Sequence, residues 1–130
     1  MSPIPLPPPS LSALFRRGPG RVGPVEADRL TADGTAVLLD VREASEWHAG
    51  HAPGAVHLPL SRLVDGASLP GRAEDRPVVV ICRSGNRSRR AARVLAERGV
   101  QATDVVGGMS AWAAEGLPVR DRRGAAGTVI

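Results

Sequence analysis

The amino-acid sequence predicts an α/β fold in which a central, mostly parallel sheet of about five strands carries helices on both faces. Short apolar runs alternate along the chain with stretches of helical periodicity, which is the order expected of strands joined by crossover helices. The apolar runs are continuous rather than alternating with polar residues, as in strands buried on both faces. Segments rich in Gly and Pro separate the runs and supply the turns.

Four strands and four helices can be assigned to residues. The apolar runs predict strands at 36–39, 55–58, 77–81 and 102–106. Each strand is followed by a segment predicted to be helical, at 43–49, 61–64, 88–98 and 109–115. The clearest pair is the β-branched run 77–81 and the helix 88–98, which carries apolar residues on one side and is followed by Gly99.

We expect one folded domain, spanning residues 22–119. The chain has 130 residues, which suits a single core, and because aromatic residues make up only 2%, that core must consist mainly of Val, Leu, Ala and Ile. Residues 1–21 are rich in Pro, Gly and Arg and are predicted to form a flexible N-terminal tail. Residues 120–130 are rich in Gly and Arg and are predicted to form a flexible C-terminal tail.

The cysteine content and the first residues favour a cytoplasmic location. The single cysteine excludes an intramolecular disulfide framework and suits a reducing compartment. The N-terminus lacks the charged and then apolar pattern of a secretory signal. No stretch approaches the roughly 20 apolar residues needed to span a bilayer, so no membrane association is expected.

The positions of the basic residues along the chain argue against a nucleic-acid partner. The formal net charge is +4, and all 17 basic residues are arginine, a composition that suits nucleic-acid binding. However, six of these arginines lie in the two predicted tails, and the densest internal group, within 83–93, surrounds the only cysteine. We therefore expect no nucleic-acid partner.

Cys82 lies between the clearest strand and the clearest helix, in a segment suited to hold an anion. The loop that follows contains Gly85 and Asn86, which can adopt left-handed backbone angles and turn N–H groups toward one point. The next helix directs the positive end of its dipole at the same point. Arg83 and Arg87 add full positive charges, and together these features favour the thiolate form of the cysteine.

A cysteine at the end of an apolar strand is more often a small buried hydrophobe than a nucleophile. A core cysteine, however, does not require a Gly-containing loop with two arginines and a helix start behind it, so we interpret Cys82 as the reactive group. The residues that follow it are expected to bind an anionic substrate: Arg83, Ser84, Gly85, Asn86, Arg87 and Ser88. Ser88 could also cap the helix.

Other polar residues are given supporting or structural roles. Asp40 and Arg42 follow the strand 36–39 and could face the same pocket, but an internal salt bridge or loop hydrogen bonds explain them at least as well. We therefore assign them a supporting role. The histidines have no Cys or His partners at metal-ligand spacing, so no metal site is predicted. Trp47 and Trp112 are predicted to be core residues.

Three groups of motifs occur in a fixed order along the chain. They are Leu-Asp-Val-Arg-Glu at 39–43 with Glu-Trp at 46–47 and Gly-His-Ala-Pro-Gly-Ala at 50–55, then Cys-Arg-Ser-Gly-Asn-Arg-Ser at 82–88, then Gly-Gly at 107–108 with Trp at 112 and Gly-Leu-Pro-Val at 116–119. Together they resemble the opening signature, the active-site loop and the closing signature of rhodanese-homology domains. The resemblance covers residues 25–119.

The resemblance implies a rhodanese-like fold and a single-domain sulfurtransferase that carries sulfur as a persulfide on Cys82. A small anionic donor such as thiosulfate would supply the sulfur, and cyanide, a small thiol or a protein thiol would accept it, in covalent chemistry that needs no metal or organic cofactor. Arg87 occupies the family's loop-closing position, and a charged residue at Arg83 resembles thiosulfate-type loops. His51 belongs to a turn that is a structural signature of the family.

The length of the loop separates related branches. Four residues lie between Cys82 and Arg87, whereas the related cell-cycle phosphatases have five between their cysteine and arginine. Ser88 occupies that later position here. The shorter loop favours sulfur transfer over phosphatase or arsenate reductase activity.

Two further alternatives remain open from the sequence. The protein could be a sulfur-relay carrier that delivers its persulfide to one protein partner, with the Pro-rich tail as a docking segment. A regulatory domain without catalysis is disfavoured because the cysteine is retained. No sequence feature indicates the oligomeric state.

Overall fold

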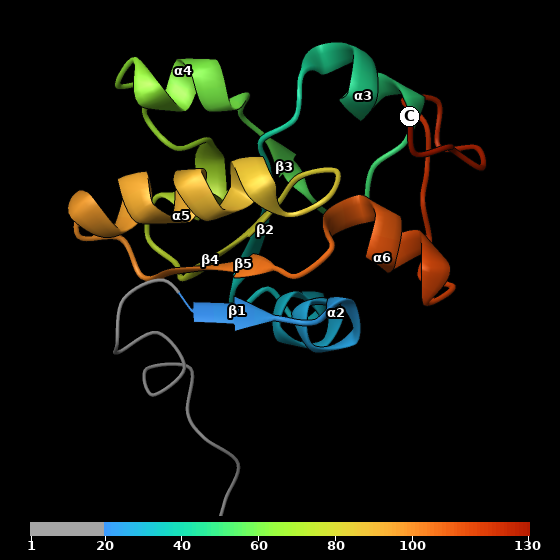
Figure 1. Cartoon of the computed structure of the whole chain (residues 1–130), viewed down its shortest axis with the longest axis horizontal. Coiled ribbons are helices and arrows are strands. Elements are labelled where there is room, and N and C mark those ends of the chain that lie inside the picture. The colour runs from blue at the N-terminus through green and yellow to red at the C-terminus, as the bar shows by residue number, and fades with distance from the viewer. Residues whose placement is uncertain (1–19) are drawn as a thin grey trace, which may run out of the picture.

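The computed structural model describes residues 20–130, and within them five parallel strands form one sheet. The strands are β1 (Gly20–Val22), β2 (Val37–Asp40), β3 (Val56–His57), β4 (Val78–Ile81) and β5 (Ala102–Val105). Their order across the sheet is β1-β5-β4-β2-β3, and every pairing is parallel (Figure 1). The predicted α/β class is confirmed.

Helices follow the strands as the alternating pattern predicts. They are α2 (Pro24–Ala32), α3 (Ala44–Ala49), α4 (Leu60–Val64), the 3-10 helix η1 (Gly71–Ala73), α5 (Asn86–Glu97) and α6 (Gly108–Ala114). Within residues 20–130, no helix combines the length and the apolar character that crossing a membrane requires.

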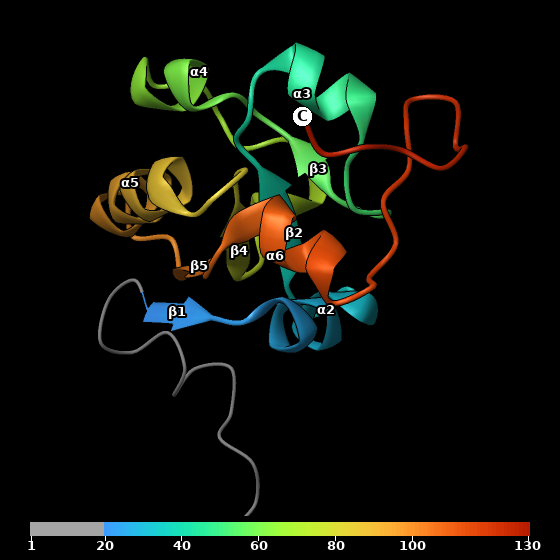
Figure 2. The ribbon, with the colours of Figure 1, turned by 45° about the vertical axis from the view of Figure 1, so that its right-hand side comes forward.

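Helices cover both faces of the sheet, as Figure 2 shows with α4 and α5 on one side and α2 and α6 on the other. The side chains of β4 are shared between the two helical layers. Val78 and Val80 pack into the cluster that includes Leu95 of α5, whereas Val79 and Ile81 pack into the cluster that includes Trp112 of α6. A strand buried on both faces must be apolar at every position, which is why this run is continuous.

Two elements at the start of the described chain were not predicted. β1 begins in the segment assigned to the N-terminal tail and ends at the first residue of the predicted domain, and its Gly-Arg-Val sequence has no apolar run to mark it. It is held by its pairing with β5, in which Gly20 lies opposite Thr103. α2 begins with Pro24 in its first turn and buries only Ala27, so its sequence carries little amphipathic pattern. The remainder of the predicted tail, residues 1–19, lies outside the described residues.

The C-terminal segment, predicted to be a flexible tail, is hydrogen-bonded to the body of the domain. The backbones of His51 and Arg120 exchange two hydrogen bonds of 2.9 Å, and Thr128 N–H donates to the carbonyl of Ala49 at 2.9 Å. Gly50 makes this approach possible, since a Cβ there would lie 2.4 Å from the Thr128 carbonyl oxygen. The glycines that suggested flexibility allow the two backbones to pack closely instead.

Candidate functional site

The only cysteine of the chain lies at the carboxyl edge of the sheet, directly after β4. Parallel strands of α/β sheets present their functional residues at this edge. The loop turns at Gly85, whose φ of 105° lies in the left-handed region, and α5 begins at Asn86. The helix therefore starts two residues earlier than predicted, and Ser88 lies inside its first turn rather than capping it.

The sulfur of Cys82 is enclosed by this loop and by the first turn of α5. Its side chain is 1% exposed, and the N–H of Gly85 donates to Sγ over 3.1 Å. The thiol in turn donates to the hydroxyl of Ser88 over 3.4 Å. The first backbone N–H groups of a helix have no partner within the helix, so those that open α5 remain available to an anion at this point.

A chain of hydrogen-bonded polar side chains leads away from the sulfur. The hydroxyl of Ser88 donates to Asp104 of β5 over 2.8 Å. Asp104 also accepts from Arg21 of β1, over 3.0 Å from Nε and 3.2 Å from Nη2. Arg21 Nη2 donates as well to the carbonyl of Gly85, over 3.1 Å. Ser88 and Asp104 are 0% and 1% exposed, whereas the side chain of Arg21 is 35% exposed, so the network runs from the interior to the surface at β1.

Neither charged member of this network is predicted from the sequence. Arg21 lies in the predicted N-terminal tail, and Asp104 lies in a predicted strand with no role assigned to it. The signal that could have identified Asp104 is its charge, since an acidic side chain within an otherwise buried strand requires a partner.

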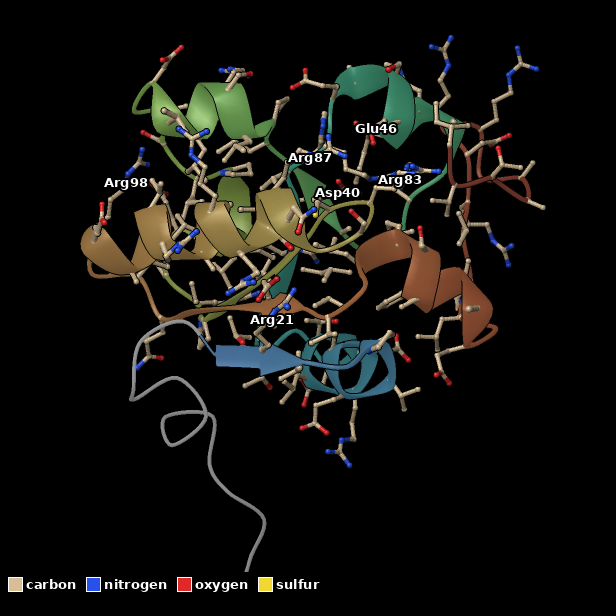
Figure 3. The ribbon with its side chains drawn as sticks, in the orientation of Figure 1. Arg21, Asp40, Glu46, Arg83, Arg87 and Arg98 are labelled. Carbon is tan, nitrogen blue, oxygen red and sulfur yellow. The ribbon has the colours of Figure 1, made fainter. Side chains whose placement is uncertain are left out.

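Arg87 is joined to α3 by a two-pronged ion pair. Its Nη1 and Nη2 donate to the two carboxylate oxygens of Glu46 over 2.7 and 2.8 Å. These hydrogen bonds hold the pKa of Glu46 below its usual range, and the same bonds raise the pKa of Arg87. Figure 3 shows the two side chains meeting between α5 and α3. The arginine expected to bind the substrate anion is thus largely committed to a carboxylate.

The remaining loop residues divide into a buried floor and an exposed rim. Gly85 is buried with the sulfur, whereas Arg83, Ser84 and Asn86 are exposed. Arg83 has no acidic group within 4.0 Å among residues 20–130, so its charge is not neutralised by a neighbour there (Figure 3).

The N-terminus of α6 holds the loop from its other side. The N–H of Met109 donates to the carbonyl of Cys82 over 2.7 Å, and the N–H of Ser110 donates to the carbonyl of Arg83 over 3.0 Å. Gly108 makes this contact possible, because a Cβ there would lie 2.3 Å from the Cys82 carbonyl oxygen. The Gly-Gly motif therefore contributes to the site by allowing two backbones to touch.

Asp40 and Arg42 form a completely buried ion pair at the end of β2. Arg42 Nη2 donates to Asp40 over 2.7 Å and to the carbonyl of Gly50 over 2.7 Å, and both side chains are 0% exposed. The pair ties the end of β2 to the turn after α3. Among the buried side-chain nitrogen and oxygen atoms of residues 20–130, Arg42 Nη1 alone lacks a hydrogen-bond partner.

Two histidines pack against one tryptophan beside this pair. The rings of His51 and His57 stack on Trp47 with centroids 3.7 and 4.8 Å away. His51 Nδ1 donates to the Trp47 carbonyl and His57 Nε2 donates to the Arg42 carbonyl, each over 2.7 Å. Trp47 is half-buried rather than a core residue, whereas Trp112 is 2% exposed.

The chain matches a known protein family and a curated relative. The family model described as "Rhodanese-like domain" matches residues 23–115. A Bacillus subtilis (strain 168) protein named "Putative sulfurtransferase YtwF" is 36% identical over 91 residues, covering 70% of this chain and 86% of that protein.

Solved structures show the same fold. A rhodanese-related protein from Thermoplasma volcanium aligns with a TM-score of 0.68 and 31% identity, over 77% of this chain and 96% of that one. The reduced CoADR-RHD protein of Bacillus anthracis aligns with a TM-score of 0.60 and 30% identity, over 73% of this chain and 16% of that one. The same unit therefore also forms a small part of a larger chain.

Proposed function

Because the chain belongs to the rhodanese-like domain family, we propose that it is a sulfurtransferase that carries sulfur as a persulfide on Cys82. The observation that carries this proposal is the environment of the sulfur, which accepts the Gly85 N–H below the open first turn of α5. A thiolate, and the terminal sulfur of a persulfide anion, would both be stabilised there.

In the first step, the Cys82 thiolate attacks the outer sulfur of a donor such as thiosulfate. A new S–S bond forms to the cysteine, the S–S bond of the donor breaks, and sulfite leaves with the electron pair of that bond. In the second step, a nucleophilic acceptor attacks the terminal sulfur and the Cys82 thiolate departs. Cyanide would yield thiocyanate, and a thiol would yield a new persulfide.

The loop residues share the task of holding the anions. The N–H groups of the first turn of α5 offer hydrogen bonds to the donor and to the departing sulfite. Arg83 supplies a positive charge at the rim, with no carboxylate within 4.0 Å among residues 20–130. Arg87 is bound to Glu46, so its main contribution is to fix the loop against α3, and the donor meets an ion pair rather than a free cation.

A second candidate function is relay of the persulfide to one protein partner. The exposed arginines that follow the loop on α5 favour it, since they extend the charged surface beyond what a small donor could contact. The four-residue spacing between Cys82 and Arg87 argues against phosphate ester hydrolysis in both cases.

The proposal is tested by incubating the protein with thiosulfate and recording its intact mass, with Cys82→Ser as the control. We expect the gain of one sulfur atom, removed by cyanide and absent in the variant. If neither thiosulfate nor polysulfide adds sulfur to the wild-type protein, the proposed function is wrong.

A further inference from the structure

The exposed side of α5 carries three arginines without acidic partners. The helix buries Ala91, Ala92 and Leu95 against the sheet, and it exposes Arg89, Arg90 and Arg93, which we call the arginine face of α5. None of these three arginines has a carboxylate within 4.0 Å among residues 20–130. The face is therefore a free positive surface on the helix that begins at the active-site loop.

The three positive charges are electrostatically unfavourable for the helix that carries them. Arg89 and Arg93 are four residues apart, and Arg90 and Arg93 are three apart, so like charges are neighbours on the helix surface. All of them precede Glu97, the only acidic residue of α5, and Arg89 and Arg90 lie toward the N-terminal end, where the helix dipole disfavours cations. By contrast, α2 pairs its arginine with Glu26 within one turn. A helix that retains such charges is suited to an external acidic partner.

Two hollows flank the arginine face and widen the surface. One, of about 100 Å³, lies between α5 and β1 and is lined by Arg21, Arg89, Arg93 and Asp104. The other, of about 340 Å³, is lined by Arg90 together with residues of α4, including Leu60 and Val64. Val64 is 43% exposed, so the second hollow offers apolar contact beside the charge. Arginine next to exposed apolar side chains is typical of protein interfaces.

We propose that the arginine face of α5 docks an acidic segment of a protein whose thiol accepts the sulfur from Cys82. This inference rests on the proposed function and names the class of its acceptor. The face begins directly after Ser88, which touches the sulfur, and extends about two helical turns from the loop. A carboxylate-rich segment bound there would hold its cysteine beside the loop mouth.

The surroundings favour an acidic protein over a nucleic acid. Glu43 and Asp65 line the hollow beside Arg90, and they would repel a continuous phosphate backbone. Stacking platforms for bases are also missing from the described chain, since Trp112 is buried and Trp47 is covered by two histidines. Separated carboxylates can pair with individual arginines and avoid these acidic residues.

The test uses the full chain loaded with thiosulfate and two cysteine peptides of equal length. In one peptide Asp and Glu flank the cysteine, and in the other Ser and Asn do. Loss of the persulfide is followed by intact mass at about 20 mM and about 500 mM salt. We expect the acidic peptide to discharge the persulfide roughly tenfold faster than the neutral one at low salt, with this advantage lost at high salt.

Reversal of the three charges in Arg89→Glu, Arg90→Glu, Arg93→Glu should abolish the advantage of the acidic peptide. It should leave discharge by uncharged 2-mercaptoethanol unchanged. The variant should fold, because carboxylates suit the N-terminal half of a helix. The matched control is Arg76→Glu, Arg122→Glu, Arg123→Glu, at three exposed arginines outside α5 that have no carboxylate within 4.0 Å among residues 20–130. It changes the net charge equally and should retain the advantage.

Three results would overturn the inference: equal rates for the two peptides, equal effects of the two triple variants, or an oligo-dT strand that binds the arginine face more tightly than the acidic peptide. If no persulfide forms, the proposed function fails separately. Docking is then measured on the unloaded protein by fluorescence anisotropy of the labelled acidic peptide with its cysteine replaced by serine. Absence of binding that depends on the arginine face would then contradict the inference.

Discussion

The hydroxyl of Ser88 donates its proton to Asp104, and it therefore meets the sulfur of Cys82 only as an acceptor. The two contacts measure 2.8 Å to the carboxylate and 3.4 Å to the sulfur. A serine has one hydroxyl proton, so while Asp104 holds it, Ser88 can accept from a thiol but cannot donate to a thiolate. The N–H of Gly85 is the donor that favours the thiolate. Gly85 thus favours the thiolate form of Cys82, whereas Ser88 favours the thiol form.

Asp104→Asn should increase the reactivity of Cys82. Arg21 Nε would retain the amide oxygen as its acceptor, and Nη2 would lose its contact with residue 104 but keep the Gly85 carbonyl. The amide NH₂ would face Ser88, and the serine proton would be released toward the sulfur. A hydrogen bond to a charged group contributes about 1.5–3 kcal/mol, so alkylation by iodoacetamide near neutral pH should accelerate roughly tenfold or more. The measurement is the time course of alkylation near neutral pH, compared between the variant and the wild-type protein.

Two further variants separate this effect from a general disturbance. Asp75→Asn, at an exposed position, should leave the alkylation profile unchanged. In a Ser88→Ala background, Asp104→Asn should have little effect on the rate, because the hydroxyl that transmits it is absent. An unchanged profile for the single Asp104 variant would show that this carboxylate only stabilises the fold.

Gly108→Ala should displace the loop that follows Cys82. The new methyl group would lie 2.3 Å from the Cys82 carbonyl oxygen and 2.7 Å from the Arg83 carbonyl oxygen, so the loop and α6 must separate. With the strain of a positive φ added to overpacking, we expect about 2–4 kcal/mol of lost stability in urea unfolding and loss of persulfide formation. Gly116→Ala is the matched control, since Gly116 also has a positive φ, 77°, but a methyl group added there would meet no atom within 4 Å. It should cost about 1 kcal/mol and leave the activity intact.

The ion pair between Glu46 and Arg87 should make stability depend on pH. The pKa of Glu46 is lowered in the folded protein, mainly by the hydrogen bonds from Arg87, so its contribution is present above the pKa of the unfolded chain and is lost as pH falls through the folded pKa. Both side chains are partly exposed, and solvent screening limits the pair to about 1 kcal/mol.

Glu46→Gln should therefore cost about 1 kcal/mol at pH 7 and progressively less below about pH 4, measured by urea unfolding. Glu26→Gln, which breaks the exposed pair with Arg29, should change stability by less than about 0.5 kcal/mol at either pH. A cost for Glu46→Gln that stays constant down to acid pH would contradict this account.

Gly50→Ala should release the C-terminal segment. The backbone of Gly50 is extended, with φ of 176°, so alanine can adopt it, but the methyl group would lie 2.4 Å from the Thr128 carbonyl oxygen. We expect rapid tryptic cleavage after Arg120, Arg122 and Arg123, detected by mass. Gly23→Ala, where nothing lies within 4 Å, should be cleaved there as slowly as the wild type.

The sequence predicted those parts of the fold that have a local signature. The run at β4 is apolar at every position because it is buried on both faces, and the helix after it has an apolar side, so the bounds of both were predicted to within two residues. β1 could not be predicted, because three residues with a central arginine have no pattern until β5 provides their partner.

In the candidate site, too, features local in the sequence could be predicted and contacts between distant residues could not. Cys82 and its loop are consecutive residues and could be identified together. The partners of Arg87 and Ser88 lie 41 and 16 residues away, and only the folded chain brings them together. Arg87 was expected to bind the substrate because of its position in the loop. Its pairing with the carboxylate of Glu46 could not be predicted from the sequence.

The edge strand β1 connects the start of the domain to the surroundings of the Cys82 sulfur. This strand has a single neighbour, β5, and its Arg21 holds Asp104, which holds Ser88 against the sulfur. Tension applied to the chain at Gly20, by a tether, a fused domain or a bound partner, would be borne by one short ladder. Peeling that ladder would detach Arg21 first, so the reactivity of Cys82 would respond to mechanical load upstream of the domain before the core unfolds.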